Sequence, residues 1–483
     1  MPDIAFLPAR ALARLIQRKK IGCLELLDHY LARVERYNPA LNAIIATDIA
    51  KARKRARAAD RALAKGKRWG PLHGVPMTVK DSFDVEGLPT TWGVPAYKDN
   101  RARHNALAVD RWQGAGAIVF GKTNVPIWLA DPQAFNAIYG RTVSPWNKAM
   151  SPGGSSGGSS AALAAGLTGI EMGSDIAGSI RTPAAFCGLF GLKPTFGICP
   201  TDGHALNDNV APLDILAIGP MGRSADDLAV GLATLAGPDE IDAAGWRLAL
   251  PPPRKTRLRD FRIGIVLDHE TAPVDPEIVG LLAKLAEFLA GKKVKISDRA
   301  RPDVDLEDAH RTFDVLLRGA TSARFSDEDQ ARFRDQLAAL PPGTETKVSR
   351  MLRGNTLLHR DWLRLNEHRH RLRRKWHAFF AEYDLLLAPV LCTATFPHLD
   401  TPPYERTLSI GGKTTPFMNQ IYWAGYSCLF YLPSAAAPIG FTRDGRPVGV
   451  QIIGPQYGDR TTIEFARLLE AEYQGFVAPP GFD

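Results

Sequence analysis

The segment 151–203 constrains the fold of this 483-residue chain more than any other part of the sequence. It begins with a glycine- and serine-rich run at 151–160 and passes directly into an alanine-rich apolar segment at 161–167. Runs of this kind are typical of flexible linkers, but linkers are flanked by polar residues. A glycine-rich backbone between apolar segments is instead typical of a chain packed in a core where a ligand approaches it. The segment therefore predicts a buried site.

The overall composition is that of an ordinary soluble globular protein, with 45% hydrophobic and 23% charged residues. A chain of this length forms roughly 2–4 domains or one large α/β domain. Its five cysteines include no C-x-x-C pair, so neither a zinc ribbon nor a redox motif is indicated. No apolar run approaches the length of a membrane span, and the N-terminal residues lack the apolar region of a signal peptide. We expect a cytoplasmic protein with reduced cysteines, no metal, no cofactor and no membrane partner.

The net charge of +9 comes partly from two basic runs, at 51–67 and 350–375. Such runs are found in proteins that bind nucleic acids or other anions. Both runs have apolar residues interleaved at helical spacing, however, and neither belongs to a recognisable nucleic-acid-binding module. We therefore interpret them as solvated helix faces and expect no nucleic-acid partner.

The remaining periodicity predicts an α/β fold with a mixed sheet. Residues 74–81 are apolar and β-branched, which predicts a buried strand with Lys80 at its end. A strand–helix–strand unit is predicted over 262–296, and the segments 434–441 and 448–454 flank a turn sequence and predict a hairpin. Residues 305–382 have mostly helical periodicity, and we interpret them as a helical insertion.

Two of these segments resemble motifs of the amidase signature family of serine hydrolases. Residues 151–195 are similar to the family's glycine- and serine-rich signature, and residues 74–83 to its lysine motif, in the same order along the chain. The resemblance extends from 36 to 455. It implies a single domain over 1–483, built on one large twisted mixed sheet surrounded by helices. A homodimer is compatible with this resemblance.

Amide hydrolysis requires a nucleophile, a base and donors for the oxyanion. His73 and His204 lie near the motifs, and either could act as the base of a Ser-His-Asp triad. The chain has no G-x-S-x-G elbow, however, and a lone histidine is more often a surface or hydrogen-bonded residue. Lys80 is the stronger candidate because burial lowers a lysine pKa by up to ~3–5 units. The alternative for Lys80 is an ion pair with Asp81 or Asp84.

The resemblance assigns roles to three residues. Lys80 is the expected general base, Ser179 the nucleophile, and Ser155 the residue that relays the proton between them. In the family the peptide bond before the relay serine is cis, which corresponds here to Gly154–Ser155. The oxyanion hole is expected to consist of the backbone amides of Ile176, Ala177, Gly178 and Ser179.

Other residues of the signature are expected to support this site. Ser156 is expected to hydrogen-bond Lys80. Asp175 and Arg181 are expected to hold the turn around the nucleophile, although Arg181 could instead meet an anionic substrate. Ala177 stands where the family usually has glycine. If position 177 requires a left-handed backbone, alanine costs ~1–2 kcal/mol; otherwise it only narrows the pocket.

Aromatic residues at 127–140 and 417–431 indicate an apolar pocket, because the resemblance places both segments around the substrate. We expect Phe135, Tyr139, Phe186 and Trp423 to line it. Apolar pockets bind through buried area, so this prediction favours aryl and alkyl groups over charged ones. The expected substrates are small amides, anilides, carbamates and esters.

Two other functions share parts of this pattern. The glutaminase component of a tRNA-dependent amidotransferase has the same signature, but it normally carries an acidic residue that holds glutamine, and 413–423 contains none. An inactive binding protein is disfavoured because Lys80, Ser155 and Ser179 are all present.

Overall fold

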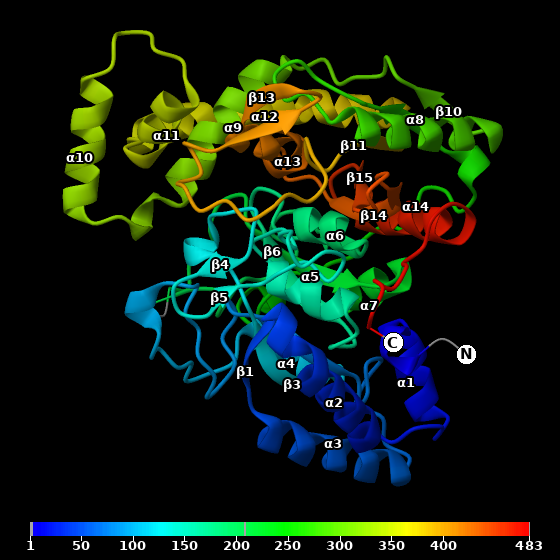
Figure 1. The fold of residues 1–483 in the computed structure, drawn as a ribbon. Coiled ribbons are helices and arrows are strands. Elements are labelled where there is room, and N and C mark those ends of the chain that lie inside the picture. The colour runs from blue at the N-terminus through cyan, green and yellow to red at the C-terminus, as the bar shows by residue number, and fades with distance from the viewer. Residues whose placement is uncertain (1–2, 207–208, 483) are drawn as a thin grey trace.

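A mixed eight-stranded sheet forms the centre of the computed structural model, which describes residues 3–206 and 209–482 (Figure 1). Three strands at one side are parallel, and the others are antiparallel to their neighbours. The predicted α/β class is therefore confirmed. The strand order is β10 (Lys295–Ser297), β9 (Arg262–Ile265), β11 (Leu385–Pro389), β15 (Pro447–Ile453), β14 (Ser434–Phe441), β7 (Phe190–Lys193), β8 (Ala217–Gly222) and β6 (Glu171–Asp175).

Helices cover both faces of this sheet. On one face lie α6 (Arg181–Cys187) and α8 (Pro276–Gly291), and on the other α7 (Ala225–Leu235) packs against α14 (Asp459–Glu472). Ser224 caps α7 by accepting a hydrogen bond from the Asp227 amide. The predicted strand–helix–strand unit is β9–α8–β10, and the predicted hairpin is β14–β15.

A second, three-stranded sheet has the order β1 (Ile44–Thr47), β3 (Ile118–Thr123) and β2 (Pro76–Lys80). Lys80 therefore ends a strand of this small sheet and not of the large one. The two sheets meet where β2 lies beside the edge strand β6, with the Thr78 hydroxyl donating to the Glu171 carboxyl. Around the small sheet lie α1 (Ala9–Gln17), α2 (Cys23–Leu41), α3 (Ile49–Ala64), α4 (Leu107–Gly114) and α5 (Gly157–Ala164).

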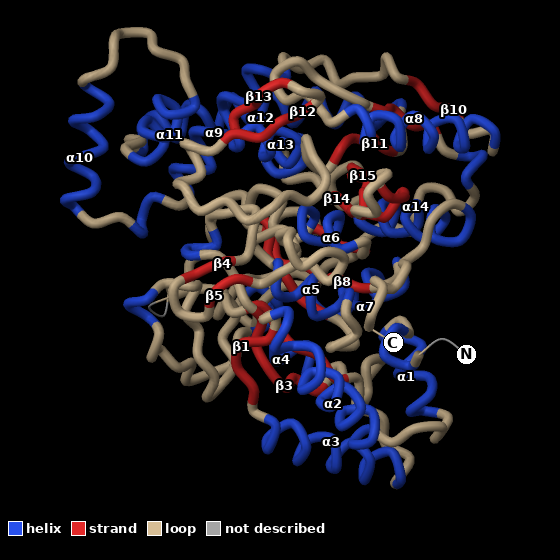
Figure 2. Tube along the Cα trace, in the orientation of Figure 1, coloured by secondary structure: helices blue, strands red, loops and turns tan. Residues whose placement is uncertain are grey.

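The helical segment predicted over 305–382 lies between β10 and β11, and its outermost helix, α10, projects from the body of the protein (Figure 2). Its helices are α9 (Leu306–Ala320), α10 (Asp327–Ala338), α11 (Lys347–Asn355) and α12 (His359–Glu382). The other elements outside the two sheets are α13 (Tyr422–Cys428) and the short pairs β4 (Phe135–Asn136) with β5 (Gly140–Arg141) and β12 (Thr407–Ile410) with β13 (Lys413–Pro416).

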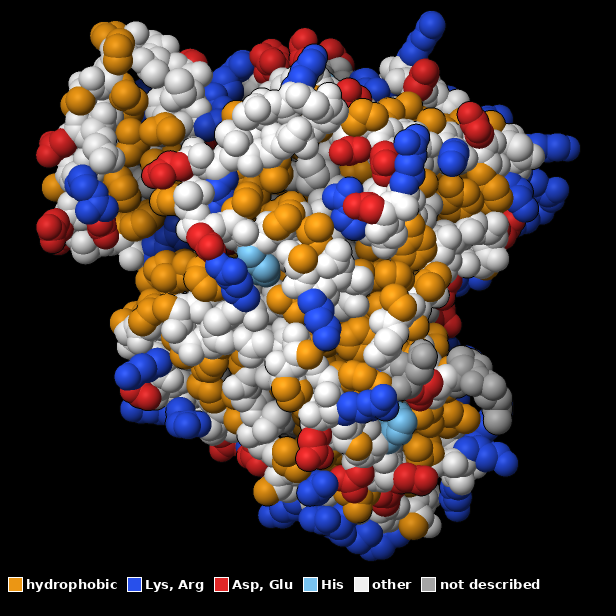
Figure 3. Space-filling model, viewed as in Figure 1, with side chains coloured by type: hydrophobic (Ala, Val, Ile, Leu, Met, Phe, Trp, Pro, Cys, Tyr) orange, Lys and Arg blue, Asp and Glu red, His pale blue; other side chains and the backbone are white. Residues whose placement is uncertain are grey.

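Both basic runs form helices with an exposed polar face. In α3 the alanines Ala52, Ala56 and Ala59 are buried, and basic side chains gather over this helix at the lower end of Figure 3. This distribution agrees with a solvated helix face. In the described ranges 3–206 and 209–482, no helix is both long and apolar enough to cross a membrane.

Candidate active site

The glycine- and serine-rich run is packed tightly in the core. Every residue from 151 to 165 is buried. A Cβ on Gly154 would lie 2.5 Å from the Asp131 carbonyl oxygen, and one on Gly158 would lie 2.3 Å from the Asn124 amide nitrogen. Atoms at these distances overlap, so glycine is required where neighbouring backbones touch. The prediction that this run is packed in the core, and is not a linker, is therefore confirmed.

Lys80 and Ser155 lie next to each other in this core. Lys80 Nζ is 2.6 Å from Ser155 Oγ and 2.9 Å from the hydroxyl of Ser174, on β6. The Gly154–Ser155 peptide bond is cis, as the resemblance implied. Ser156 does not have its expected role, because its hydroxyl is buried and has no hydrogen-bond partner among the described residues. Ser174, which the sequence analysis missed, takes the second contact with Lys80.

Burial controls the charge of Lys80. Its side chain is fully buried, and this desolvation lowers the pKa of Lys80 from 10.5 to about 7, although the carboxylates of Asp175 and Asp81 pull it upward. Lys122 Nζ lies 3.8 Å from Asp81 Oδ1, so the ion pair with Asp81 that was considered for Lys80 is made by Lys122. A substantial fraction of Lys80 is therefore neutral near pH 7.

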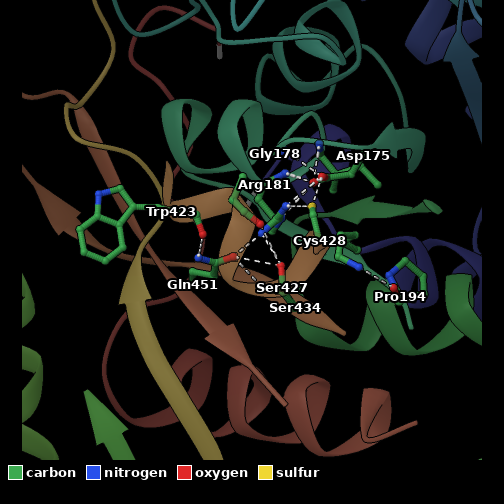
Figure 4. Close-up of polar contacts among 12 residues, drawn as sticks. Asp175, Gly178, Arg181, Pro194, Trp423, Ser427, Cys428, Ser434 and Gln451 are labelled. Carbon is green, nitrogen blue, oxygen red and sulfur yellow. Dashed lines mark hydrogen bonds and ion pairs between the residues drawn. The ribbon is translucent and has the colours of Figure 1, made fainter. Parts of the chain in front are cut away.

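Asp175 holds the turn that carries Ser179. Its carboxylate accepts from the amides of Gly178 at 2.7 Å and Ile180 at 3.1 Å, and from Arg181 Nε at 2.9 Å (Figure 4). Burial opposes ionisation of Asp175, but Arg181 and these amides outweigh it and hold the pKa of Asp175 well below its usual value. The carboxylate therefore orders the turn in its charged form.

Arg181 makes its hydrogen bonds within the protein and is not available to bind a substrate. It is 1% exposed, and Arg181 Nη2 donates to Asp175 at 2.9 Å. Its remaining donors reach Ser427, Gln451 and Cys428, as Figure 4 shows. The supporting interpretation of Arg181 agrees with these contacts, and the anionic-substrate alternative does not.

The backbone amides around Ser179 divide into two groups. The Gly178 amide donates to Asp175 and is not available for an oxyanion, which corrects one of the four predicted donors. The amides of Ile176, Ala177 and Ser179 have no acceptor among the described residues. Gly178 has a left-handed φ of 103°, whereas Ala177 is not in that region. Alanine at 177 therefore costs no backbone strain and only narrows the space beside Ser179.

A cavity lies directly over this turn. Gly154, Ala177 and Ser179 line it, and the Ser156 amide donates to the Ser179 carbonyl at 3.2 Å, which joins the run to the turn. The cavity has a volume of about 100 Å³. Other parts of the wall come from other segments of the chain and include Trp92, Trp128, Leu129, Asp131, His204, Leu213, Leu216, Leu317, Arg318, Thr321, Arg324, Met418 and Ile421.

The four aromatic residues predicted to line the pocket lie elsewhere. Phe135 is 36% exposed, with Arg141 over its ring. Phe186 packs edge-on against Phe396, and Trp423 is fully buried in the core. Tyr139 is half-buried and is also absent from the wall.

The two predicted segments do reach the cavity, but through different side chains. Trp128 comes from 127–140, and Met418 and Ile421 come from 417–431. The Trp128 amide donates to the Trp92 carbonyl at 2.8 Å, so the wall contains two tryptophans from loops distant in sequence.

The two histidines considered as bases differ in position. His73 accepts from the Trp69 amide at 3.1 Å and does not line the cavity. His204 lies in the wall between Phe83 and Trp92, with ring centroids 4.7 and 5.2 Å away. Burial, aided by repulsion from Lys80, lowers the pKa of His204 to about 3, so it is neutral at pH 7. Neither of its ring nitrogens has a partner among the described residues.

Comparison with known proteins places the whole chain in one family. Residues 25–463 match the Amidase family. An acylamidase from Rhodococcus erythropolis is 32% identical over 475 residues, covering 97% of this chain and 96% of its own length. An indoleacetamide hydrolase from Bradyrhizobium diazoefficiens is 30% identical over 466 residues, covering 95% of this chain and 85% of its own length. A solved bacterial aryl acylamidase of the amidase signature enzymes superposes with a TM-score of 0.80 at 25% identity, covering 97% of this chain and 96% of its own.

A glutamyl-tRNA(Gln) amidotransferase component from Methylococcus capsulatus is similar to the same extent. It is 32% identical over 476 residues, covering 94% of each chain. Sequence similarity therefore does not separate hydrolases from amidotransferases within the family.

The family match and the relatives define a hydrolase that acts on carbon–nitrogen bonds. The chain belongs to the amidase signature family and is an amidase.

Proposed function

We propose that this amidase is a serine amidohydrolase that cleaves small amide, anilide, carbamate and ester bonds through an acyl-enzyme. The observation that carries the proposal is the pairing of Lys80 Nζ with Ser155 Oγ at 2.6 Å, in a core where burial keeps much of the lysine neutral. A neutral amine this close to a hydroxyl can accept its proton. The similarity to an acylamidase and to an aryl acylamidase supports the same reaction class.

In this scheme Ser179 Oγ attacks the substrate carbonyl carbon, and its proton passes to Ser155 as the Ser155 proton passes to Lys80. The free amides of Ile176, Ala177 and Ser179 would stabilise the negative charge that develops on the carbonyl oxygen. The tetrahedral intermediate then collapses, the carbon–nitrogen bond breaks, and the amine leaves with a proton returned through Ser155. Water repeats the sequence on the acyl-enzyme and releases the acid.

The glutaminase component of an amidotransferase is the alternative, because the chain is as similar to one such protein as to the acylamidase. The composition of the cavity wall argues against glutamine. Its only acidic residue in the described part of the chain is Asp131, which lies 2.7 Å from Arg406. No carboxylate of this wall is left to bind the α-ammonium group of glutamine.

Covalent labelling tests the nucleophile. A fluorophosphonate probe followed by peptide mass spectrometry should modify Ser179, and Ser179→Ala should lose both labelling and hydrolysis. The matched control is Ser160→Ala, because Ser160 is a buried serine of the same run that has no hydrogen-bond partner among the described residues. Labelling at another serine, or full activity of Ser179→Ala, would refute the mechanism. A higher kcat/KM for glutamine than for acetanilide would favour the amidotransferase alternative.

A further inference from the structure

The cavity over Ser179 has a cationic wall. Arg318 at the end of α9 and Arg324 in the short helix Ser322–Arg324 both line it, and both side chains are half-buried. The rest of that side is apolar and includes Leu317, Met418 and Ile421. Two guanidinium groups therefore share a small apolar space with the proposed nucleophile.

Neither arginine is neutralised within the described ranges. No carboxylate of residues 3–206 or 209–482 lies within 4.0 Å of Arg318 or Arg324. Asp131, the acidic residue of the wall, is paired with Arg406 at 2.7 Å. The Nε atom of Arg324 is buried and has no hydrogen-bond acceptor among the described residues.

Aromatic rings orient the two guanidinium groups without cancelling their charge. Arg324 lies over the Phe325 ring at 4.8 Å, and Arg318 lies over the Tyr404 ring at 5.3 Å. Burial and the neighbouring Arg318 lower the pKa of Arg324 to about 10, so Arg324 remains charged at pH 7. Stacking of this kind leaves the planar donor edges available for an anion.

Other buried arginines of this protein have acceptors on the protein itself: Arg223, for example, donates to the carbonyls of Leu163 at 2.8 Å and Thr168 at 3.0 Å. Arg181 pairs with Asp175, and Arg369, also fully buried, pairs with Asp214 at 2.9 Å. A buried charge without a partner is costly. The pair in the cavity wall departs from this pattern at the place where a substrate can supply the missing anion.

We propose that the substrate carries a carboxylate at the end of an apolar aryl or alkyl segment, and that Arg318 and Arg324 bind this carboxylate while Ser179 attacks the amide. This inference rests on the proposed function and narrows its substrate class. It differs from the expectation, drawn from the aromatic residues of the sequence, that the pocket favours aryl and alkyl groups over charged ones. Guanidinium–carboxylate hydrogen bonds are the strong, directional kind that selects one substrate over a neutral analogue.

Matched substrate pairs test this proposal in two arms. In the first, the carboxylate is on the amine side: 4-acetamidophenylacetate is compared with neutral 4-propylacetanilide. In the second it is on the acyl side: glutaranilate is compared with 5-methylhexananilide. We expect kcat/KM for the carboxylate of one pair to exceed that of its neutral twin by about 10- to 100-fold, the usual range for hydrogen bonds to charged groups.

Substitution then assigns the preference to residues. Arg324→Gln and Arg318→Gln should each remove most of this preference, by raising KM for the carboxylate more than KM for its neutral twin. Arg311→Gln is the matched control, because Arg311 is on the same helix but pairs with Glu307 and does not line this cavity. Its preference should equal that of the wild type.

The wild-type protein supplies a test that does not depend on the folding of variants. Phenylacetate should inhibit hydrolysis of the neutral twin competitively, and at least about 10-fold more strongly than 2-phenylethanol. Equal inhibition by the two compounds, or neutral twins that are hydrolysed as well as carboxylates in both arms, would overturn the proposal. Turnover of the neutral twin that survives Ser179→Ala would instead overturn the proposed function, so the two failures are distinguishable.

Discussion

The proposed role of Lys80 predicts a specific pH dependence of hydrolysis. The pKa of Lys80 falls from 10.5 to about 7 because its side chain is fully buried. This displacement corresponds to roughly 5 kcal/mol of preference for the neutral amine. At pH 7 about half of the molecules then carry a neutral Lys80, whereas an exposed lysine would be neutral in fewer than about one molecule in a thousand.

The direction of the pH dependence follows from which protonation state of Lys80 acts as the base. Only the neutral amine accepts a proton, so kcat/KM should increase with pH, reach half of its maximum near pH 7 and level off above about pH 8. At pH 5 the neutral fraction is roughly 1%, so activity there should be about 100-fold below the plateau. The assay is initial-rate hydrolysis of 4-propylacetanilide between pH 5 and 9, since this substrate has no group that ionises in that range.

Lys80→Ala is the companion measurement. Loss of a general base typically lowers the rate by ~10²–10⁴, so the variant should lose at least about 100-fold at pH 8 and any remaining activity should lose the step near pH 7. A flat profile in the wild-type protein would refute the argument, as would a midpoint near pH 7 that persists unchanged in Lys80→Ala.

Three further predictions concern Ser174, the two histidines and the turn that carries Ser179. Ser174→Ala removes the acceptor 2.9 Å from Lys80 Nζ, so kcat should fall about 10-fold. The midpoint of the pH profile should shift downward because a hydrogen bond that stabilises the charged amine is lost. An upward shift of this midpoint would contradict the prediction. His204→Phe should change KM because His204 lines the cavity, but the midpoint of its pH profile should stay near pH 7. His73→Phe should change neither KM nor this midpoint. A folded histidine variant without turnover would identify a histidine as the base. Gly178→Ala should lower the free energy of unfolding by more than about 1–2 kcal/mol, because Gly178 has a φ of 103° and a Cβ there would lie 2.9 Å from Thr182 Oγ1. Ala177→Gly should lower it by about 1 kcal/mol or less. Equal urea midpoints for the wild type and Gly178→Ala would show that the turn tolerates a side chain at 178.

The sequence alone was sufficient for the parts of this protein that depend on local pattern. Strand and hairpin periodicity predicted β2, the β9–α8–β10 unit and the β14–β15 hairpin, because side-chain alternation and turn residues act over a few positions. Glycines in an apolar context predicted a buried run, and Gly154 and Gly158 show why: neighbouring backbones leave no room for a Cβ. Lys80 was also identified from local pattern, because it is a cation on an otherwise apolar strand.

Tertiary structure decided which side chains meet. The sequence favoured Ser156 as a partner of Lys80, whereas the packing of β2 beside β6 places Ser174 there instead. The Gly178 amide is lost as an oxyanion donor because Asp175 folds back to accept from it. These outcomes depend on distances of a few ångströms between segments that the sequence does not relate.

The cavity shows most clearly which features the sequence predicts and which depend on tertiary structure. Segments 127–140 and 417–431 both contribute to the cavity over Ser179. The aromatic residues chosen from them point into the core or toward solvent, however, and Trp128, Met418 and Ile421 line the wall instead. The charge of that wall could not be predicted from the sequence, because an arginine is neutralised or not according to which acids the fold brings within reach. Composition and periodicity describe each segment by itself, whereas pairing of charges and the shape of a cavity are properties of several segments packed together.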